Sequence, residues 1–354
     1  MISLPYASLF AQLLDFVPRN RFDQLVQKQR WANSSILGIK EAPKRSTLVY
    51  ANEHRPWQLY QDIFNLVLEG AQGVAKEKGK TGFRFKNPLY SLDASVIDLC
   101  LEVFDWAKFR RTKGAVKLHL ILDHQGYLPT FAHITEGRIH EIKMAQRLNL
   151  PSGSIVAMDR GYNDYSLFAA WCERDVFFVT RLKDNAVYQV LEELEPNGKN
   201  IRKDQIILLT GNGAQEKCPH MLRRIVVWDE ENERELVLLT NILQFAAATI
   251  ARIYKARWQI ELFFKALKQN LRVKTFVGTS ANALKIQIWT ALITMLILKI
   301  LKLKATFNWS LSNLVALLRM NLFTYRDLWK WINAPFETLP IRPPQFEQLE
   351  LNLG

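Results

Sequence analysis

Hydrophobic and polar positions between residues 89 and 180 alternate first with the period of strands and then with the period of helices. The two kinds of run follow one another in the order β-β-β-α-β-α-β. The predicted strands span residues 89–93, 115–122, 128–135, 154–158 and 176–180, and the predicted helices span 141–148 and 165–173. This order predicts an α/β fold with a mixed central sheet flanked by helices.

A β-rich stretch follows this series. Strand-like runs at residues 205–210, 222–228 and 235–240 are punctuated by two glycines and a proline. Glycine and proline are typical of the turns between strands. We therefore expect a β-rich insertion at about residues 184–243.

Helical periodicity dominates the rest of the chain. Residues 245–271 contain neither proline nor glycine and predict one long helix. Further helices are predicted at residues 8–17, 22–29, 57–71, 280–303, 311–320 and 325–332. The predicted division is a helical region at 1–86, an α/β domain at 87–275 that contains the insertion, and a helical region at 276–354.

The charge of the chain indicates a polyanionic partner. Hydrophobic residues make up 49% and charged residues 23%, as in ordinary globular proteins. The formal net charge is +13. Residues 1–88 hold thirteen Lys and Arg against seven Asp and Glu, so about half of the excess positive charge lies in the first quarter of the chain. We therefore expect residues 1–86 to bind DNA.

Cysteine usage indicates a reducing compartment. Cys100, Cys172 and Cys218 are widely separated, odd in number and form no Cys-x-x-Cys pair. This excludes a disulfide scaffold and a zinc finger as the basis of the fold. The N-terminus also lacks the charged-then-apolar layout of a signal peptide, so we expect a cytoplasmic protein.

The most apolar window, residues 286–303, is interrupted by polar side chains. They are Gln287, Thr290, Thr294, Lys299 and Lys302. A membrane span would carry few such groups. We interpret this window as a buried helix and expect no membrane contact.

The predicted helix at residues 245–271 carries a polar stripe. Tyr254, Arg257, Glu261 and Lys268 are spaced Y-x2-R-x3-E-x6-K, which places the four side chains within an arc of roughly 60°. Apolar residues occupy the neighbouring arc, so the stripe borders the buried side of the helix. A carboxylate between an Arg, a Lys and a Tyr suits a metal site that also binds phosphate. The alternative is an ordinary helix with ion pairs at i,i+4 and i,i+7 spacing.

Two aspartates follow apolar runs that read as strands. Asp93 ends the run 89–93, and Asp159 follows the run 154–158. The carboxyl ends of strands in α/β sheets are common places for ligands. Asp98, in a helix-like run at 96–106, and Asp123, in a predicted hairpin turn, are weaker candidates. Each aspartate alone could also be a helix cap or a turn acid.

Asp93, Asp159 and Glu261 together predict a cation site. Three carboxylates without a His or Cys cluster specify hard divalent ions such as Mg²⁺ or Mn²⁺. Two such ions about 3.5–4 Å apart activate an attacking oxygen and stabilise the leaving oxygen in phosphodiester cleavage.

These motifs resemble those of bacterial DDE transposases of the insertion-sequence-four type, a cut-and-paste family with a Tyr-Arg-Glu-Lys signature. The matching motifs are the polar stripe, Asp159-Arg160-Gly161-Tyr162 and Asp93-Ala94-Ser95. Residues 45–55 resemble the segment that precedes the catalytic region of this family. The similarity spans nearly the whole chain.

The resemblance implies a ribonuclease-H-like catalytic core in which Asp93, Asp159 and Glu261 hold two Mg²⁺ or Mn²⁺ ions. It further implies cleavage of the element's DNA ends through a hairpin and transfer of those ends into target DNA. Arg160, Arg257 and Lys268 are then expected to contact phosphates, with Tyr254 positioning the backbone. The resemblance implies double-stranded DNA and a second copy of the chain as partners in a synaptic complex. It also implies that the protein acts at the bacterial nucleoid.

One departure from the family leaves other functions open. The family carries a longer helical region before the segment 45–55, where this chain has only residues 27–44. An inactive or repurposed transposase that only binds DNA is therefore one alternative, and a metal-dependent nuclease without strand transfer is another. The resemblance also suggests that the insertion holds a distorted DNA end with an aromatic side chain, for which Trp228 is a candidate, although a strand Trp more often belongs to a core.

Overall fold

A computed structural model describes most of the chain. The described residues are 45–78, 82–100, 104, 106–110, 113–137, 141–211, 213–270, 278–321 and 327–337. The helices predicted at residues 8–17 and 22–29, and the connecting segment 27–44, lie outside the described residues.

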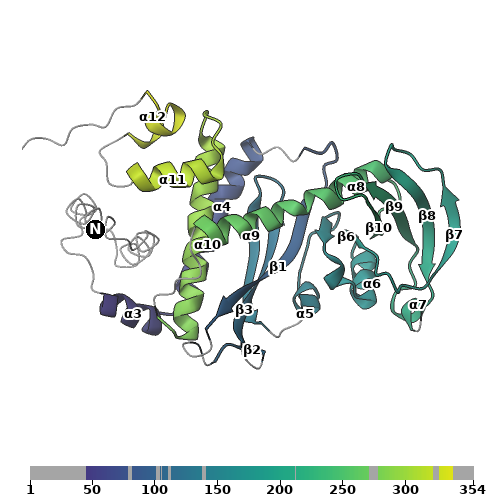
Figure 1. The fold of residues 1–354 in the computed structure, drawn as a ribbon, viewed down its shortest axis with the longest axis horizontal. Coiled ribbons are helices and arrows are strands. Elements are labelled where there is room, and N and C mark those ends of the chain that lie inside the picture. Colours follow the sequence, from purple (N-terminus) through teal and green to yellow (C-terminus); the bar gives the residue numbers. More distant parts are fainter. Residues whose placement is uncertain are drawn as a thin grey trace, which may run out of the picture.

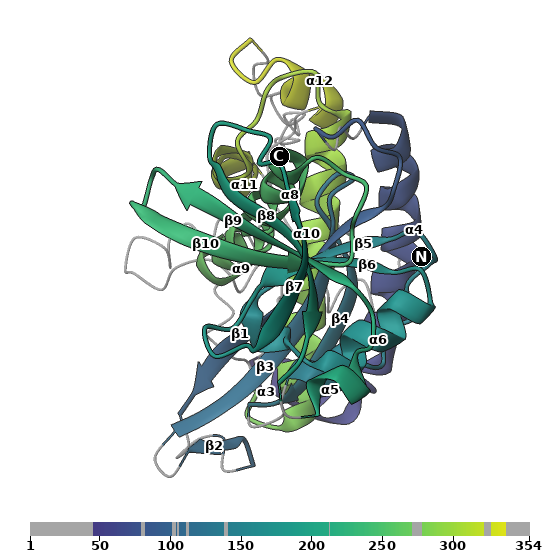
Figure 2. The same ribbon diagram turned by 90° about the vertical axis from the view of Figure 1, so that its right-hand side faces the viewer.

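The described strands form a single mixed sheet of ten strands (Figure 1). The strands are β1 (Leu89–Leu99), β2 (Lys108–Arg110), β3 (Lys113–Asp123), β4 (Leu128–Glu136), β5 (Ile155–Met158), β6 (Phe177–Arg181), β7 (Tyr188–Leu194), β8 (Ile201–Leu209), β9 (Leu222–Asp229) and β10 (Arg234–Thr240). Their order is β2-β3-β1-β5-β6-β10-β9-β8-β7, with β4 paired to β3. Figure 2 views the molecule from the β7 end and shows the strands fanning out, as the twist of a large sheet requires.

The first half of the sheet confirms the predicted order β-β-β-α-β-α-β, with the short β2 added. β1, β3 and β4 pair antiparallel, whereas β1, β5 and β6 are parallel. Parallel neighbours need crossover connections. These contain α5 (Glu141–Ala145) and α6 (Tyr165–Glu173). The Asp164 side chain caps α6 by accepting the Leu167 N–H.

The first predicted strand is longer than expected. β1 does not end at Asp93 but continues to Leu99, so the helix-like run expected at residues 96–106 begins as strand and Asp98 lies in β1. The reason is tertiary. β3 offers a partner along the whole length of β1, from Tyr90↔Asp123 to Leu99↔Gly114. Asp123, predicted in the hairpin turn, is instead the last residue of β3, directly before the turn at residues 124–127, and its side chain accepts the Gln125 N–H at 2.8 Å.

The stretch predicted as a β-rich insertion forms strands, and these extend the central sheet. β10 pairs antiparallel with β6, and β9, β8 and β7 follow outward. The sequence prediction missed β7, because its side chains are mostly exposed on both faces and show no apolar alternation. Trp228, in β9, is half-buried beneath the Arg202 guanidinium, 5.6 Å from the ring centroid.

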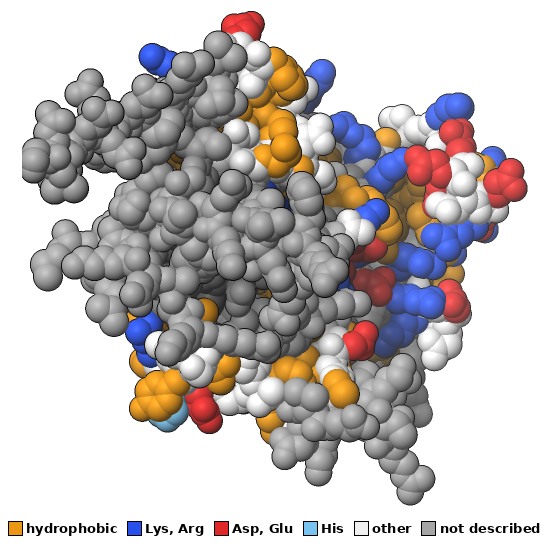
Figure 3. Space-filling view, turned by 60° about the vertical axis from the view of Figure 1, so that its left-hand side comes forward, with side chains coloured by type: hydrophobic (Ala, Val, Ile, Leu, Met, Phe, Trp, Pro, Cys, Tyr) orange, Lys and Arg blue, Asp and Glu red, His pale blue; other side chains and the backbone are white. Residues whose placement is uncertain are grey.

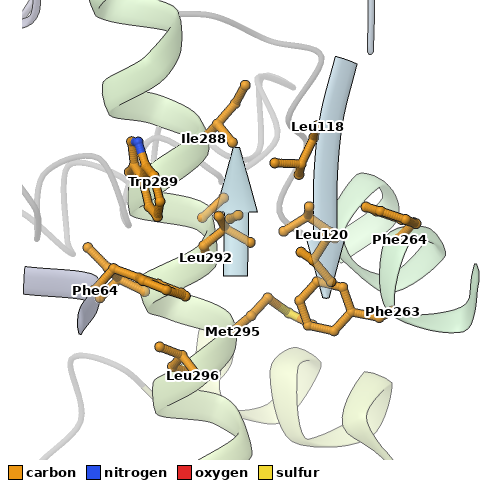
Figure 4. Close-up of a cluster of buried hydrophobic side chains, with 14 of the residues drawn as sticks. Phe64, Leu118, Leu120, Phe263, Phe264, Ile288, Trp289, Leu292, Met295 and Leu296 are labelled. Carbon is orange, nitrogen blue, oxygen red and sulfur yellow. The ribbon is translucent and has the colours of Figure 1, made fainter. Parts of the chain in front are cut away.

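Helices from both ends of the chain cover one face of the first half of the sheet. They include α4 (Gln58–Lys78) and α10 (Ala281–Lys304), and α3 (Arg45–His54) packs against α10. α10 packs along α4, and its apolar side chains meet those of β3 and α9 (Trp258–Asn270) in a buried cluster (Figure 4). Residues labelled in that cluster include Phe64, Leu118, Phe263, Trp289 and Leu292.

The predicted buried helix at residues 280–303 corresponds to α10. By length and composition this helix could cross a membrane, yet 67% of its most apolar window is buried inside the protein. Burial against α4, β3 and α9 accounts for its apolar character.

The remaining helices complete the fold. α8 (Ala247–Ala256) packs on β5 and β6. α11 (Leu311–Asn321) and α12 (Leu328–Asn333) form a small cluster around Trp309 and Trp331 beside the end of α10. α7 (Ala214–Lys217) is a single turn in the insertion.

Candidate active site

Asp93 and Asp159 lie at neighbouring positions of two parallel strands. The parallel pairing of β1 with β5 runs through Ser91↔Ala157 and Leu92↔Met158. The next residue on each strand is one of the two aspartates. Asp93 is therefore at the end of the parallel pairing although it is in the middle of β1, and Asp159 follows β5 directly, before a 3-10 turn at Arg160–Tyr162.

Both aspartates belong to the face of the sheet that α8 covers. Ala157 in β5 and Leu89 in β1 pack in one cluster with Ile250 and Ile253 of α8. Because side chains alternate between the faces of a strand, positions two or four residues further along share that face. Asp93 is four residues after Leu89, and Asp159 is two residues after Ala157, so both aspartates lie on that face.

The long helix predicted at residues 245–271 is divided into α8 and α9 at Arg257. The Arg257 N–H donates to the Tyr254 carbonyl at 3.1 Å, and the Ile260 N–H donates to the Arg257 carbonyl at 3.1 Å. These three-residue turns are tighter than those of an α-helix and interrupt it locally. The expectation of one uninterrupted helix was wrong at this residue.

The Arg257 side chain lies between two of the three candidate carboxylates. One guanidinium nitrogen, Nη2, donates to Glu261 Oε1 at 2.6 Å, and the other, Nη1, is 3.5 Å from Asp93 Oδ2. The exposed fractions of the side chains are 13% for Arg257, 20% for Asp93 and 34% for Glu261. The guanidinium carbon is 5.7 Å from the centroid of the Tyr254 ring. Three members of the polar stripe thus contact one another beside β1.

Asp93 is in a strongly perturbed electrostatic environment. Burial raises the pKa of its carboxyl to about 6, and the charges of Glu261 and Asp159 add to this rise. The Ala94 N–H, 2.8 Å from Asp93 Oδ1, and the Arg257 guanidinium act in the opposite direction. Both other carboxylates are therefore close enough to influence Asp93, as expected for groups that share a site.

Lys268 and Arg160 differ in where they point. Lys268 Nζ donates to the Val96 carbonyl of β1 at 3.0 Å, so the fourth member of the stripe also reaches the strand that carries Asp93. Arg160 instead forms an exposed ion pair with Asp184 at 3.2 Å.

Sequence reasoning missed two basic residues near this edge of the sheet. Arg181 ends β6, the parallel neighbour of β5. Burial raises the pKa of the Tyr254 hydroxyl, and the charge of Arg181 acts against this rise. Lys183 donates to the Asn163 carbonyl at 3.2 Å. Arg181 directly follows the apolar run 176–180, so the end-of-strand argument that selected Asp159 would also have found it. Cationic and acidic side chains lie close together on the right of Figure 3.

The donor chemistry of the site fits a hard divalent cation. Asp93, Asp159 and Glu261 offer only carboxylate oxygens, which Mg²⁺ and Mn²⁺ prefer. Among the residues that the structure describes, no group of three or more His, Cys, Asp or Glu side chains is arranged closely enough to hold a metal ion. In this arrangement Arg257 forms ion pairs with Asp93 and Glu261.

Comparison with known proteins identifies the family. A family model described as "Transposase DDE domain" matches residues 84–297. A Sinorhizobium fredii protein named as a transposase, y4zB, is 28% identical over 292 residues, which cover 81% of this chain and 80% of that protein. A protein of Geobacillus stearothermophilus, named as a transposase for insertion sequence element IS5377, is 26% identical over 75% of this chain and 70% of its own length.

A third relative points the same way. A protein of Synechocystis, named as a transposase for insertion sequence element IS4SA, is 27% identical over 72% of this chain and 71% of its own length. The family model covers well over half of the chain, including both candidate aspartates, Arg257 and Glu261. The chain belongs to the bacterial DDE transposase family.

Proposed function

We propose that this protein is an insertion-sequence transposase that binds the terminal repeats of its element, cleaves the DNA ends and joins them to target DNA. One observation carries the proposal. Asp93 and Asp159 follow the last paired positions of two adjacent parallel strands, and Glu261 is linked to Asp93 through Arg257. Asp93 and Asp159 thus start from neighbouring positions at one edge of the sheet and Glu261 shares an ion-pair partner with Asp93, which supports a site formed by the three carboxylates.

Asp93, Asp159 and Glu261 are the residues that would hold two Mg²⁺ or Mn²⁺ ions. When bound, such ions supply an activated oxygen nucleophile and stabilise the leaving oxygen of a phosphodiester. The carboxylates themselves fix where the scissile phosphate can lie, because they are anchored on β1, β5 and α9.

The basic residues around the carboxylates would bind the DNA backbone. Arg257 and Lys268 lie beside β1, and Arg181 ends β6, the neighbour of β5, so all three would neutralise phosphates near the acids. Tyr254, next to Arg257, would position the backbone by a hydrogen bond. Arg160, exposed and paired with Asp184, would reach phosphate further from the acids. Phosphate contacts place DNA without reading its sequence.

The larger architecture is proposed on the same basis. A ribonuclease-H-like catalytic domain at residues 87–275 is supported by the mixed sheet flanked by helices and by the site at the end of the parallel pairing between β1 and β5. Residues 1–86 would bind the terminal repeats, and residues 276–354 would contact a second copy in a homodimeric synaptic complex at the nucleoid. The insertion at about residues 184–243 would support the distorted DNA end.

The decisive experiment uses DNA from the ends of the encoding element. Purified protein and Mg²⁺ should cleave this DNA, and Glu261→Gln should abolish cleavage while DNA binding is largely retained. Glu173→Gln, an exposed acid at the end of α6, is the matched control and should cleave normally. Cleavage by Glu261→Gln at the wild-type rate would refute the assigned role.

A pre-cut end with a free 3′-hydroxyl separates the proposal from its alternatives. Joined products are expected from a transposase. A nuclease would cleave the intact ends but yield no joined product from the pre-cut end. A repurposed DNA-binding protein would bind both substrates and alter neither.

A further inference from the structure

We infer that Arg257 is an internal counter-ion of the carboxylate site, which a divalent cation must displace and which a DNA phosphate draws away. Cation binding would then be coupled to DNA binding through this one side chain. The inference rests on the proposed function, because it takes Asp93, Asp159 and Glu261 to be the cation ligands.

Arg257 uses the oxygens that a cation would need. Asp93 Oδ2 and Glu261 Oε1 both contact the guanidinium, and Asp93 Oδ1 accepts the Ala94 N–H at 2.8 Å. Mg²⁺ binds carboxylate oxygens at about 2.0–2.1 Å and demands that they converge on one point. A guanidinium placed between two carboxylates prevents that convergence. Arg257 therefore has to release at least one of them before an ion can bind.

The position of Arg257 also reduces the electrostatic repulsion between the carboxylates. Asp93 is mostly buried and lies within the electrostatic reach of Glu261 and Asp159. Like charges that share a partly buried site repel one another strongly unless a cation neutralises them. The single guanidinium supplies a positive charge to two carboxylates at once. A bound divalent cation would neutralise the carboxylates in place of the guanidinium.

The guanidinium is suited to change partners. Its Nε is buried and has no hydrogen-bond acceptor among the described residues, so its donors are incompletely used in this position. A phosphate accepts two parallel hydrogen bonds from a guanidinium. A phosphate of the DNA backbone would offer Nε the acceptor that it lacks.

The test measures Mn²⁺ binding by the full-length chain rather than its activity. Protein dialysed against a chelator is titrated with Mn²⁺ by calorimetry, with and without a duplex from the element's ends. Without DNA, Arg257→Gln is expected to bind Mn²⁺ about tenfold more tightly than the wild type or better, a change of about 1.4 kcal/mol. The duplex should raise the affinity of the wild type by a similar factor and change that of Arg257→Gln little.

Two matched variants control for other effects. Lys265→Gln removes an exposed positive charge from α9, the helix that carries Glu261, and should leave Mn²⁺ affinity near that of the wild type. Arg257→Lys keeps the charge but can pair with only one carboxylate at a time, so its affinity should fall between wild type and Arg257→Gln. Should Arg257→Gln fail to fold, Arg257→Lys decides, because an affinity equal to that of the wild type would overturn the inference.

Glu261→Gln separates failure of this inference from failure of the proposed function. If Glu261→Gln binds Mn²⁺ as the wild type does, the carboxylates are not the cation ligands and the proposed function loses its metal site. If Glu261→Gln loses Mn²⁺ while Arg257→Gln gains no affinity, the metal site stands and the counter-ion role of Arg257 is wrong.

Discussion

Individual side chains at the centre of this protein depend on groups that are remote in the sequence. Arg257 contacts Asp93, which precedes it by 164 residues. Arg181, at the end of β6, influences the hydroxyl of Tyr254 in α8. Substitutions at such positions therefore test the tertiary arrangement and not only the local helix or strand.

Lys268 is expected to contribute to DNA affinity through charge. Its ammonium lies beside β1, near the proposed scissile phosphate. Lys268→Ala should weaken binding to duplexes of any sequence and lower the slope of log affinity against log salt by about one. Fluorescence anisotropy at several salt concentrations measures both. Lys302→Ala, an exposed residue of α10 outside the regions proposed to bind DNA, is the control, and an equal slope for wild type and Lys268→Ala would exclude the phosphate contact.

His124 should make the protein sensitive to acid. It is fully buried, its Nε2 is 2.7 Å from Ser91 Oγ, and burial lowers its pKa from 6.5 to about 4. Because the folded state holds the proton less tightly than the unfolded state, this residue's contribution to stability falls as the pH drops from about 6.5 to about 4. At pH 5 the expected loss relative to neutral pH is about 2 kcal/mol from this residue.

Urea unfolding at pH 7 and pH 5 measures that loss. His124→Asn should show an acid loss smaller by about this amount, whatever its stability at pH 7. His54→Asn, an exposed histidine of α3, should leave the acid loss as it is in the wild type. An identical acid loss in wild type and His124→Asn would show that His124 does not titrate in this range.

Among the secondary-structure elements, the connection between the insertion and α8 depends on one buried arginine. Arg223 of β9 binds both oxygens of Asp204 in β8, at 2.8 and 2.6 Å. It also donates to the carbonyls of Leu243 and Phe245, which lead into α8. This guanidinium thus connects two strands of the insertion to the segment that leads into α8, the helix that carries Tyr254.

Arg223→Ala should destabilise the protein by about 3–5 kcal/mol, because it leaves the Asp204 charge buried and unpaired. The double variant Arg223→Met/Asp204→Leu should recover much of that loss, since it removes both charges. Urea unfolding compares the two. Arg234→Ala, which breaks an exposed contact with Asp229 at 3.8 Å, should cost less than about 1 kcal/mol. Equal losses for Arg223→Ala and Arg234→Ala would contradict the assignment.

Across the protein as a whole, the described parts share one sheet, and helices from both ends of the chain share the largest buried cluster with β1, β3 and β4. α10, near the C-terminus, packs on α4 from the N-terminal part, on β3 and on α9. The insertion continues the same sheet through β10 and β6. The molecule should therefore unfold cooperatively, although its sequence divides into regions with different patterns of predicted helices and strands.

Leu292 tests this cooperativity because it is fully buried at the centre of α10 (Figure 4). Leu292→Ala should lower the free energy of unfolding by about 2–5 kcal/mol. Tryptophan fluorescence and far-ultraviolet circular dichroism should report the same shifted transition. Leu262→Ala, an exposed leucine of α9, is the control and should change stability little. Separate transitions by the two probes would show that the molecule does not unfold as one unit.

Much of the architecture was predictable from local patterns. The helix at 165–173 was predicted at its observed bounds, and the strands near residues 155, 177, 222 and 235 were predicted within about two residues. Periodicity is a property of neighbouring residues, so it survives without knowledge of the fold. β7 could not be predicted, since pairing with β8 rather than an apolar pattern makes it a strand.

The residue types of the site and their spacing also came from the sequence, as did the family resemblance that the comparisons bear out. Only the tertiary structure decided that Asp93 stands in the middle of β1, that α8 and α9 separate at Arg257, and that Arg257 contacts two carboxylates. Strand length is set by the partner that β3 provides, and an ion pair forms only where distant backbones approach. Local sequence specifies which groups are available, whereas strand register and helix packing determine which of them meet.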